Sequence, residues 1–416
     1  MIACGLDFGT SNSGVALVRE GSVALAHVED AHTALPSAIF FPTDAGAHVA
    51  YGRAAMREYL DGTPGRLMRS LKSLLGSRLV HERTAVGERS LAFTDILTLY
   101  LRMLRERAER DAGAALSAVV LGRPVRFVDD DAARDADAQA TLESCARAAG
   151  FRDVEFQLEP IAAAFDYERS VAREESVLVV DVGGGTADFT VIRVGPGRHA
   201  RVDRASDVLA NDGVHIAGTD FDTRLHLAWV MPLLGYGSTS PKGLAMPSPL
   251  FFDLATWHRI NLLYGAATRE TLRELRDFFG DAAMYARLRR VVEEALGHEL
   301  LTRTEAAKID LSDRDRTGID LAHVETGLAV VARRSELESL LAELLGRLCA
   351  LGLATVRAAG LRPDAISTVY FTGGSSGMTA LREAFVPAFP ASRIAVGDLF
   401  GSVVSGLGID AARRFR

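Results

Sequence analysis

The sequence has few cysteines, no excess of basic residues and no long uncharged apolar segment, and each absence excludes a class of protein. Its three cysteines, Cys4, Cys145 and Cys349, are widely separated and form no CxxC or Cys/His group. Neither a disulfide scaffold nor a zinc site is therefore predicted. The formal net charge of −7 argues against nucleic acid as a partner, because binding to phosphate backbones relies on clustered Lys and Arg.

The chain also lacks signals for targeting or membrane insertion. Its first apolar residues follow no basic segment and lead directly into a turn at Asp7, and no later segment reaches a charge-free span of about 18 residues. These features predict a cytoplasmic protein with no membrane partner. The apolar content of 48% and the charged content of 24% over 416 residues are typical of a globular chain with two or more packed cores. We expect two lobes.

The most informative feature is a short turn that occurs twice. Asp7-Phe-Gly-Thr10 and Asp181-Val-Gly-Gly-Gly-Thr186 each lie between two runs of apolar residues. Both patterns predict strand, turn and strand, as duplication of a whole lobe would produce. A third glycine turn, Thr372-Gly-Gly-Ser375, follows a predicted strand at 368–371.

Alternating helices and strands are predicted elsewhere. Helices are expected at 95–110, at 136–149, after Glu159-Pro160 and at 335–359, and strands at 118–121 and 154–158. Residues 220–311 are expected to be mostly helical. Small residues at 162–164 and 406–408 suit two helices that cross closely between the lobes. The predicted fold class is α/β.

The repeated turn has residues that suit phosphate and metal binding. Glycine lets backbone N–H groups converge on an anion without a Cβ in the way. Aspartates hold hydrated Mg²⁺, which keeps several waters. One such turn is weak evidence, because Asp and Gly are common turn formers, but two copies and a third glycine turn favour a nucleotide-binding cleft. The chain has neither a GxxxxGK[ST] loop nor an intact GxGxxG after a strand, which disfavours P-loop and Rossmann sites.

The chain resembles the ATPase domain of the DnaK-type chaperones, the heat-shock protein 70 family, in the motifs GLDFGTSNS, RSLKSLLG, LEPIAAAFDYE, VVDVGGGTADFTV, HIAGTDFD, RTEAAKIDLS and FTGGSS. Its short form is most similar to the YegD-like group. The resemblance implies a two-lobed actin-like ATPase fold, with duplicated ribonuclease-H-like lobes and a nucleotide cleft between them. Lobe I would comprise 1–172 and 398–416, and lobe II 173–397 with a mostly helical insert at about 220–312.

The resemblance also implies ATP or ADP and Mg²⁺ as ligands, and it assigns roles to individual residues. The metal would be held, through water, by Asp7, Asp181 and Asp188, and the catalytic residues would be Lys72, Glu159, Asp181 and Thr186. The nucleotide contacts would be Gly9, Thr10, Ser11, Gly183, Gly184, Gly185, Gly218, Glu305, Lys308, Ser312, Gly373, Gly374 and Ser375. Lys72 matches a lysine that contacts the γ-phosphate and the attacking water. By its neighbours alone it would be a solvated surface lysine.

Two departures from the family bear on function. The family stacks adenine between two arginines, and the matching positions here are Ile309 and Gly377, so we expect weaker nucleotide binding. The chain also ends where a full-length chaperone would continue, so we expect no peptide-binding domain.

The resulting hypothesis is a slow chaperone-like ATPase whose lobes close on adenine nucleotide, with client proteins or cochaperones as partners. The alternatives are a sugar or small-molecule kinase, a filament-forming protein of the actin branch, and a degenerate nucleotide sensor.

Overall fold

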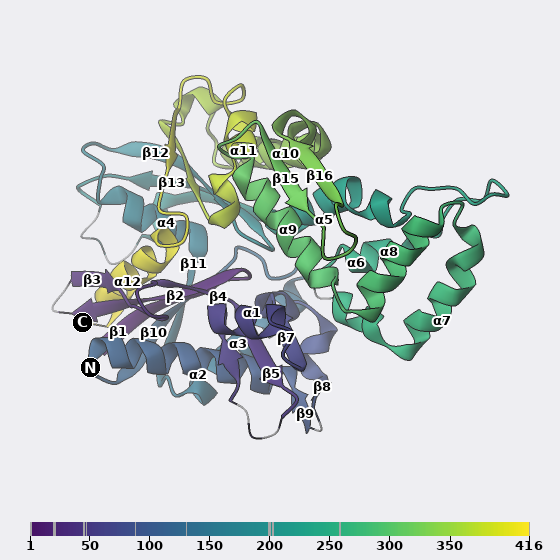
Figure 1. Ribbon diagram of the computed structural model, residues 1–416. Helices are drawn as coiled ribbons and strands as arrows, with labels where there is room; N and C mark the ends of the chain where they lie inside the picture. The colour runs from purple at the N-terminus through teal and green to yellow at the C-terminus, as the bar shows by residue number, and fades with distance from the viewer. Residues whose placement is uncertain are drawn as a thin grey trace. The chain divides into compact units, whose positions relative to one another are not determined.

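The computed structural model describes residues 2–19, 22–44, 46, 48–87, 89–129, 131–198, 201, 204–257 and 259–415 (Figure 1). By its internal contacts the chain forms two units. Unit 1 contains Met1–Ala217, Arg347–Gly377 and Arg382–Arg416, and unit 2 contains Gly218–Gly346 and Met378–Leu381. Both predicted lobes contribute to unit 1, so the lobe boundaries at 172 and 398 stay predictions.

Unit 1 contains two sheets with the same strand order and the same strand directions. The first sheet has the order β3-β2-β1-β10-β11, and the second has the order β14-β13-β12-β17-β18. Strands at the same position in the two orders correspond to each other. In each sheet the earliest strand pairs antiparallel with its hairpin partner and parallel with a later strand. The predicted duplication and the predicted α/β class are therefore confirmed.

The strands of the first sheet are β1 (Ile2–Phe8), β2 (Asn12–Arg19), β3 (Ser22–Leu25), β10 (Leu116–Arg123) and β11 (Asp153–Leu158), with β4 (Ala34–Pro36) pairing β2. Those of the second are β12 (Glu175–Val182), β13 (Ala187–Val194), β14 (Val208–Val214), β17 (Thr368–Thr372) and β18 (Arg393–Val396). Smaller strands of unit 1 are β5 (Ala38–Pro42), β6 (Ala50–Tyr51), β7 (Gly65–Arg69), β8 (Arg83–Val86) and β9 (Arg89–Ala92).

The two repeated turns connect β1 to β2 and β12 to β13. The run Val177–Val182 is buried throughout, as expected for a central strand covered on both faces. The second turn is closed by the Gly183 N–H, which donates to the Thr186 carbonyl at 3.0 Å. Across the hairpins, Asp7 pairs with Gly14 and Asp181 pairs with Asp188. The strands therefore carry each aspartate to the end of a buried ladder.

The helices of unit 1 are α1 (Gly52–Leu60), α2 (Phe93–Ala112), α3 (Ala132–Ala149), α4 (Glu159–Glu168) and α12 (Ser402–Arg414), while α10 (Arg334–Ala358) and α11 (Thr379–Phe385) belong partly to each unit. Helix α3 begins four residues before the predicted start, because the Asp131 carboxylate caps it by accepting the Arg134 N–H at 3.0 Å. Helix α4 begins at Glu159 with Pro160 in its first turn, as predicted.

Helices α4 and α12 pack against each other in unit 1 (Figure 1). A Cβ placed on Gly406 of α12 would lie 1.7 Å from the Ala162 carbonyl oxygen of α4. A Cβ on Gly408 would lie 2.7 Å from the Cβ of Ala16. Glycine is therefore required at both positions, and the predicted close crossing of two helices is confirmed.

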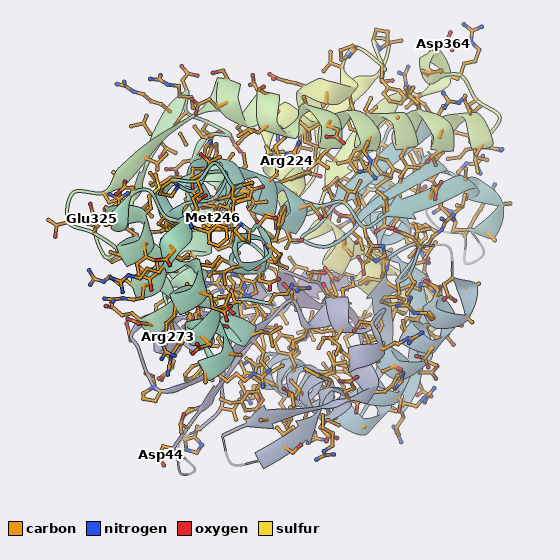
Figure 2. The ribbon with its side chains drawn as sticks, turned by 90° about the vertical axis from the view of Figure 1, so that its right-hand side faces the viewer. Asp44, Arg224, Met246, Arg273, Glu325 and Asp364 are labelled. Atoms are coloured by element: carbon orange, nitrogen blue, oxygen red, sulfur yellow. The ribbon has the colours of Figure 1, made fainter. Side chains whose placement is uncertain are left out.

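Unit 2 is mostly helical, as predicted for 220–311. Its elements are α5 (Gly218–Trp229), α6 (Pro249–Leu254), α7 (Ala266–Leu275), α8 (Ala282–Glu293), α9 (Gly297–Asp310), β15 (Arg316–Asp320) and β16 (Ala329–Arg333). Arg273 of α7 and Glu325 lie on its outside (Figure 2). In its interior His226 is fully buried, with Nδ1 2.7 Å from the Thr304 hydroxyl.

Helix α10 is long and apolar enough to cross a membrane by length and composition alone, with a mean hydropathy of 1.6, and it is the one helix of the described residues that meets this test. Core helices of soluble proteins meet the same test. Leu337, Leu341 and Leu348 of α10 are buried, so this face of the helix packs against other residues of the chain. The expectation of no membrane partner stays a prediction.

Candidate functional site

The repeated turns of unit 1 face each other within van der Waals distance. A Cβ on Gly184 would lie 2.2 Å from the Ser11 hydroxyl oxygen, and one on Gly185 would lie 3.0 Å from the Thr10 hydroxyl oxygen. The glycines of the second turn thus make room for the hydroxyls of the first. Residues from two hairpins distant in sequence are brought to one place.

The third glycine turn joins the second. The Ser375 hydroxyl donates to the Gly183 carbonyl at 2.7 Å. Gly373 has a φ of +82°, a conformation that favours glycine, and a Cβ there would lie 2.4 Å from the Asp181 carboxylate. The third turn therefore adjoins the Asp181 carboxylate and the second turn, which itself faces the first.

Four acidic side chains and one lysine gather at these turns. Asp7 ends β1, Glu159 begins α4, and Asp181 and Asp188 face each other across the second hairpin. Lys72 lies in the 3₁₀ helix η1 (Leu71–Leu74) and is only 6% exposed, so the surface interpretation of this lysine is wrong. Its ammonium donates to the Glu159 carboxylate. These five side chains, here called the acidic cluster, place four carboxyl groups around a single ammonium.

Burial and mutual repulsion raise the pKa values of the aspartates. Burial, reinforced by the charge of Glu159, raises the pKa of Asp7 and of Asp188 to about 7 and that of Asp181 well above its ordinary value. Burial alone would lower the pKa of Lys72, but the neighbouring carboxylates, Glu159 foremost, outweigh it and raise this pKa. The acidic cluster therefore retains protons near neutral pH that a cation would displace.

The Asp188 carboxylate also has two hydrogen-bond donors. The Val125 N–H donates to its Oδ1 at 2.8 Å, and the Thr186 hydroxyl hydrogen-bonds to it. Both bonds favour the charged form and so limit the rise of this pKa. Thr186 thus lies in the acidic cluster, beside the residue that it helps to orient.

The acidic cluster fits a hydrated divalent cation. Asp7 Oδ1 is buried and has no hydrogen-bond partner among the described residues, although a buried carboxylate oxygen ordinarily has one. Over the same part of the chain, no three His, Cys, Asp or Glu side chains form a direct metal-binding group. Contact through the water shell, which Mg²⁺ gives up reluctantly, suits this arrangement.

Four of the predicted nucleotide contacts, Gly218, Glu305, Lys308 and Ser312, belong to unit 2 and are described within it alone. Gly218 begins α5, and Glu305 and Lys308 lie on α9. The Lys308 ammonium pairs with the Asp222 carboxylate at 2.7 Å, and the Ser312 carbonyl accepts the Thr379 hydroxyl at 3.0 Å. The roles of these four residues, like those of the unit 1 residues, stay predictions.

Sequence reasoning missed the side chains that hold the turns in place. The Ser37 hydroxyl donates to the Gly9 carbonyl at 2.6 Å. The Arg382 guanidinium donates to the carbonyls of Ser376 and Gly377 at 2.8 and 2.7 Å. Neither Ser37 nor Arg382 belongs to a recognisable sequence motif, so the sequence offered no signal that these side chains contact the turns.

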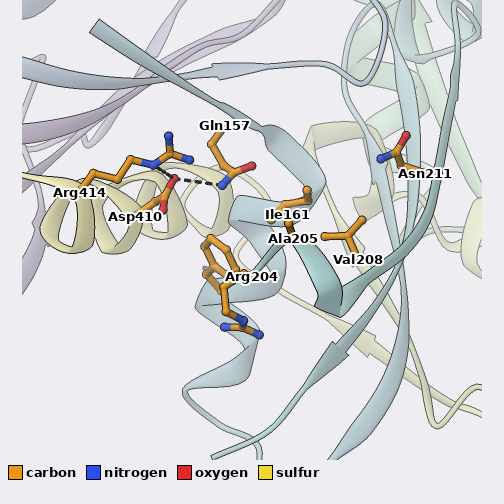
Figure 3. Close-up of a pocket in the computed structure, with 9 residues that line it drawn as sticks. Gln157, Ile161, Arg204, Ala205, Val208, Asn211, Asp410 and Arg414 are labelled. Carbon is orange, nitrogen blue, oxygen red and sulfur yellow. Dashed lines mark hydrogen bonds and ion pairs between the residues drawn. The ribbon is translucent and has the colours of Figure 1, made fainter. Parts of the chain in front are cut away.

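Unit 1 also contains a cavity of about 520 Å³ beside α4, α12 and β14 (Figure 3). It is lined by residues other than those predicted to bind phosphate. At one side the Gln157 amide and the Arg414 guanidinium both donate to the Asp410 carboxylate, at 3.0 and 2.9 Å. The polar side chains at this wall therefore satisfy one another.

The duplicated sheets and the facing turns define an actin-like ATPase fold with two lobes built on one plan. The chain matches the family model "Hsp70 protein" over residues 3–231, which is more than half of its length. It belongs to the Hsp70 protein family.

Curated relatives of the chain include chaperone proteins of the HscA type. The chaperone protein HscA homolog of Laribacter hongkongensis is 32% identical over 262 residues, which cover 58% of this chain and 39% of the relative. The chaperone protein HscA of Edwardsiella ictaluri is 27% identical over 422 residues, covering 96% of this chain and 54% of the relative. The homolog of Azoarcus sp. is 29% identical over 409 residues, covering 93% and 54%. The chain spans about half the length of the curated relatives it matches. The YegD-like grouping stays a prediction.

Proposed function

We propose that the chain is a chaperone-like ATPase that binds ATP or ADP with Mg²⁺ between its repeated turns and hydrolyses ATP slowly. Membership of the Hsp70 protein family and relatives named as chaperone proteins support this proposal. The single observation that carries it is the acidic cluster, in which Asp7 has a buried unpartnered oxygen and Lys72 is buried against Glu159 beside two facing glycine turns. A buried negative cluster without a cation is costly, and a metal–phosphate ligand would relieve it.

The proposed reaction is in-line attack of water on the γ-phosphate, for which positioning and electrostatics supply most of the rate. The Lys72 ammonium and the backbone N–H groups of both turns would stabilise charge on the transferred group. Asp181 or Glu159 would orient the attacking water, and the raised pKa of Asp181 means that this carboxylate accepts a proton more readily. Bound Mg²⁺ would neutralise phosphate charge, held through water by Asp7, Asp181 and Asp188.

The same proposal includes closure of the lobes on the nucleotide. Helices α4 and α12 meet at Gly406 and Ala162 with no side chain between the backbones, and small sliding of closely packed helices is a known mode of domain closure. Glu159, at the start of α4, belongs to the acidic cluster. A cation–phosphate ligand that attracts Glu159 would therefore act directly on α4, one of the two helices proposed to slide. Client proteins or cochaperones are proposed partners on family membership alone.

The test is phosphate release from the full chain with MgATP, with and without EDTA, a peptide, or a panel of sugars and polyols. Slow release that needs Mg²⁺ and is independent of sugar is the expected result. Release that requires a particular sugar would support the kinase alternative. Binding of MgATP without turnover would support the sensor alternative, for which the loss of arginine at Ile309 and Gly377 is the motivating observation.

A further inference from the structure

The third glycine turn separates two different surfaces of unit 1. At its start Gly373 adjoins the Asp181 carboxylate. At the next residue, a Cβ on Gly374 would lie 3.0 Å from the ring of Phe400, and a Cβ on Gly377 would lie 2.9 Å from the Leu399 side chain. The turn therefore leads from a charged cluster to an apolar wall within five residues.

Phe400 is exposed to 48%, and its ring lies against the third turn at Gly374. Its backbone is held: the Asp398 carboxylate accepts the N–H of Phe400 at 3.1 Å and that of Gly401 at 3.0 Å. The loop is joined to β17 by the Gly397 N–H, which donates to the Phe371 carbonyl at 2.9 Å. The Phe400 ring is thus exposed to solvent on a backbone whose position is fixed by hydrogen bonds.

The turn beneath the ring is equally constrained. Ser375 bonds to the Gly183 carbonyl of the second turn, and Arg382 holds the carbonyls of Ser376 and Gly377. The ring therefore has a fixed place beside the residues proposed to bind phosphate. If the phosphates of a nucleotide bind at the acidic cluster, its sugar and base must extend from there over a neighbouring surface.

We propose that Phe400 is the nucleobase platform of this site, its ring stacking on the base of a nucleotide whose phosphates bind at the repeated turns. The assignment rests on the proposed function and names a residue that determines affinity for the base. Aromatic faces stack on any base, and such stacking is sequence-tolerant. Gly377 has no side chain with which to cover a base, and the apolar wall of Leu399 and Phe400 takes that place.

The experiment compares binding of MgATP with binding of inorganic tripolyphosphate and Mg²⁺ by titration calorimetry. Tripolyphosphate reports the phosphate site without a base. We expect Phe400→Ala to weaken MgATP binding by about 5- to 100-fold and to leave tripolyphosphate binding within about twofold. Phe400→Trp should retain MgATP binding, because a larger aromatic face is kept. Phe252→Ala is the matched control, since Phe252 of α6 is exposed to 45% and should affect neither ligand.

Each outcome decides the assignment. Unchanged MgATP binding in Phe400→Ala would overturn it, and so would an equal loss of MgATP and tripolyphosphate binding, which would indicate damage to the turn. Wild-type protein that binds neither ligand would overturn the proposed function and this assignment together. Wild-type protein that binds tripolyphosphate as tightly as MgATP would overturn the assignment alone.

Discussion

Replacing Asp188 by Asn should stabilise the fold, because it removes one of the carboxylates that repel one another in the acidic cluster. The same change should weaken the proposed metal–nucleotide site. Burial and Glu159 raise the pKa of Asp188 from 3.8 to about 7. Each pKa unit corresponds to about 1.4 kcal/mol, so ionising this group in the folded protein costs up to about 4 kcal/mol at pH values well above 7. Asparagine removes that charge while its Oδ1 can still accept the Val125 N–H.

The pH dependence fixes the sign of the effect. With a folded pKa above the unfolded value, the folded state binds more protons between pH 4 and 7, and so the ligand-free protein loses stability as the pH rises through that window. The gain from Asp188→Asn should therefore be larger at pH 8.5 than at pH 5.0, by about 1 to 4 kcal/mol. Asp7 and Asp181, whose pKa values are also raised, act in the same direction in both proteins.

The assay is urea denaturation in EDTA at both pH values, followed by the same measurement with saturating MgATP. Ligand should stabilise the wild type more than the variant, since a ligand contributes in proportion to the logarithm of its concentration over Kd. Asp364→Asn is the control: Asp364 lies on the surface in η7 (Pro363–Ala365) (Figure 2) and should change stability by less than about 0.5 kcal/mol. A variant that is less stable than wild type at pH 8.5, or equally shifted at both pH values, would refute the reasoning.

Two further predictions test catalysis and packing. Lys72→Met should lower phosphate release at least about 100-fold and cost about 3 to 5 kcal/mol of stability, because it leaves Glu159 buried without a partner. Adding Glu159→Gln to this variant should restore stability to denaturant but should not restore phosphate release. Release by Lys72→Met within threefold of wild type (about 0.7 kcal/mol) would remove Lys72 from the mechanism. Gly406→Ala should destabilise by about 2 kcal/mol or more in denaturant titrations, because the new Cβ would meet the Ala162 carbonyl. Gly346→Ala, where a Cβ on α10 meets nothing within 4 Å, should instead stabilise by about 0.5 to 1 kcal/mol, and equal effects of the two changes would contradict the packing argument.

Much of the secondary structure could be predicted because its signals are local. Alternating and helical patterns gave the paired hairpins, the helix after Glu159-Pro160 and the long helix α10. Helix starts were less certain: α3 begins at Ala132 because the Asp131 side chain caps it, and α10 begins at Arg334, one residue before the predicted start. Differences of one to four residues at a helix start depend on which side chain reaches a free N–H group, and apolar spacing does not encode that contact.

The candidate site was predictable in its residue types and less so in its environment. The repeated Asp-Gly-Thr turns marked Asp7 and Asp181 directly. Lys72 stood in a segment that looked solvated, and only its burial against Glu159 shows otherwise. The residues that brace the turns, Ser37 and Arg382 among them, come from segments with no motif of their own.

By itself, the sequence determined that a strand–turn–strand unit occurs twice and that each copy has a carboxylate and glycines at the turn, because these depend on neighbours within a few residues. Only the tertiary structure decided that both copies build sheets of one strand order, that glycines of one turn receive hydroxyls of the other, and that Asp7, Lys72, Glu159, Asp181 and Asp188 form one cluster. The physical reason is that burial and charge repulsion are summed over groups distant along the chain, and no local pattern specifies that sum.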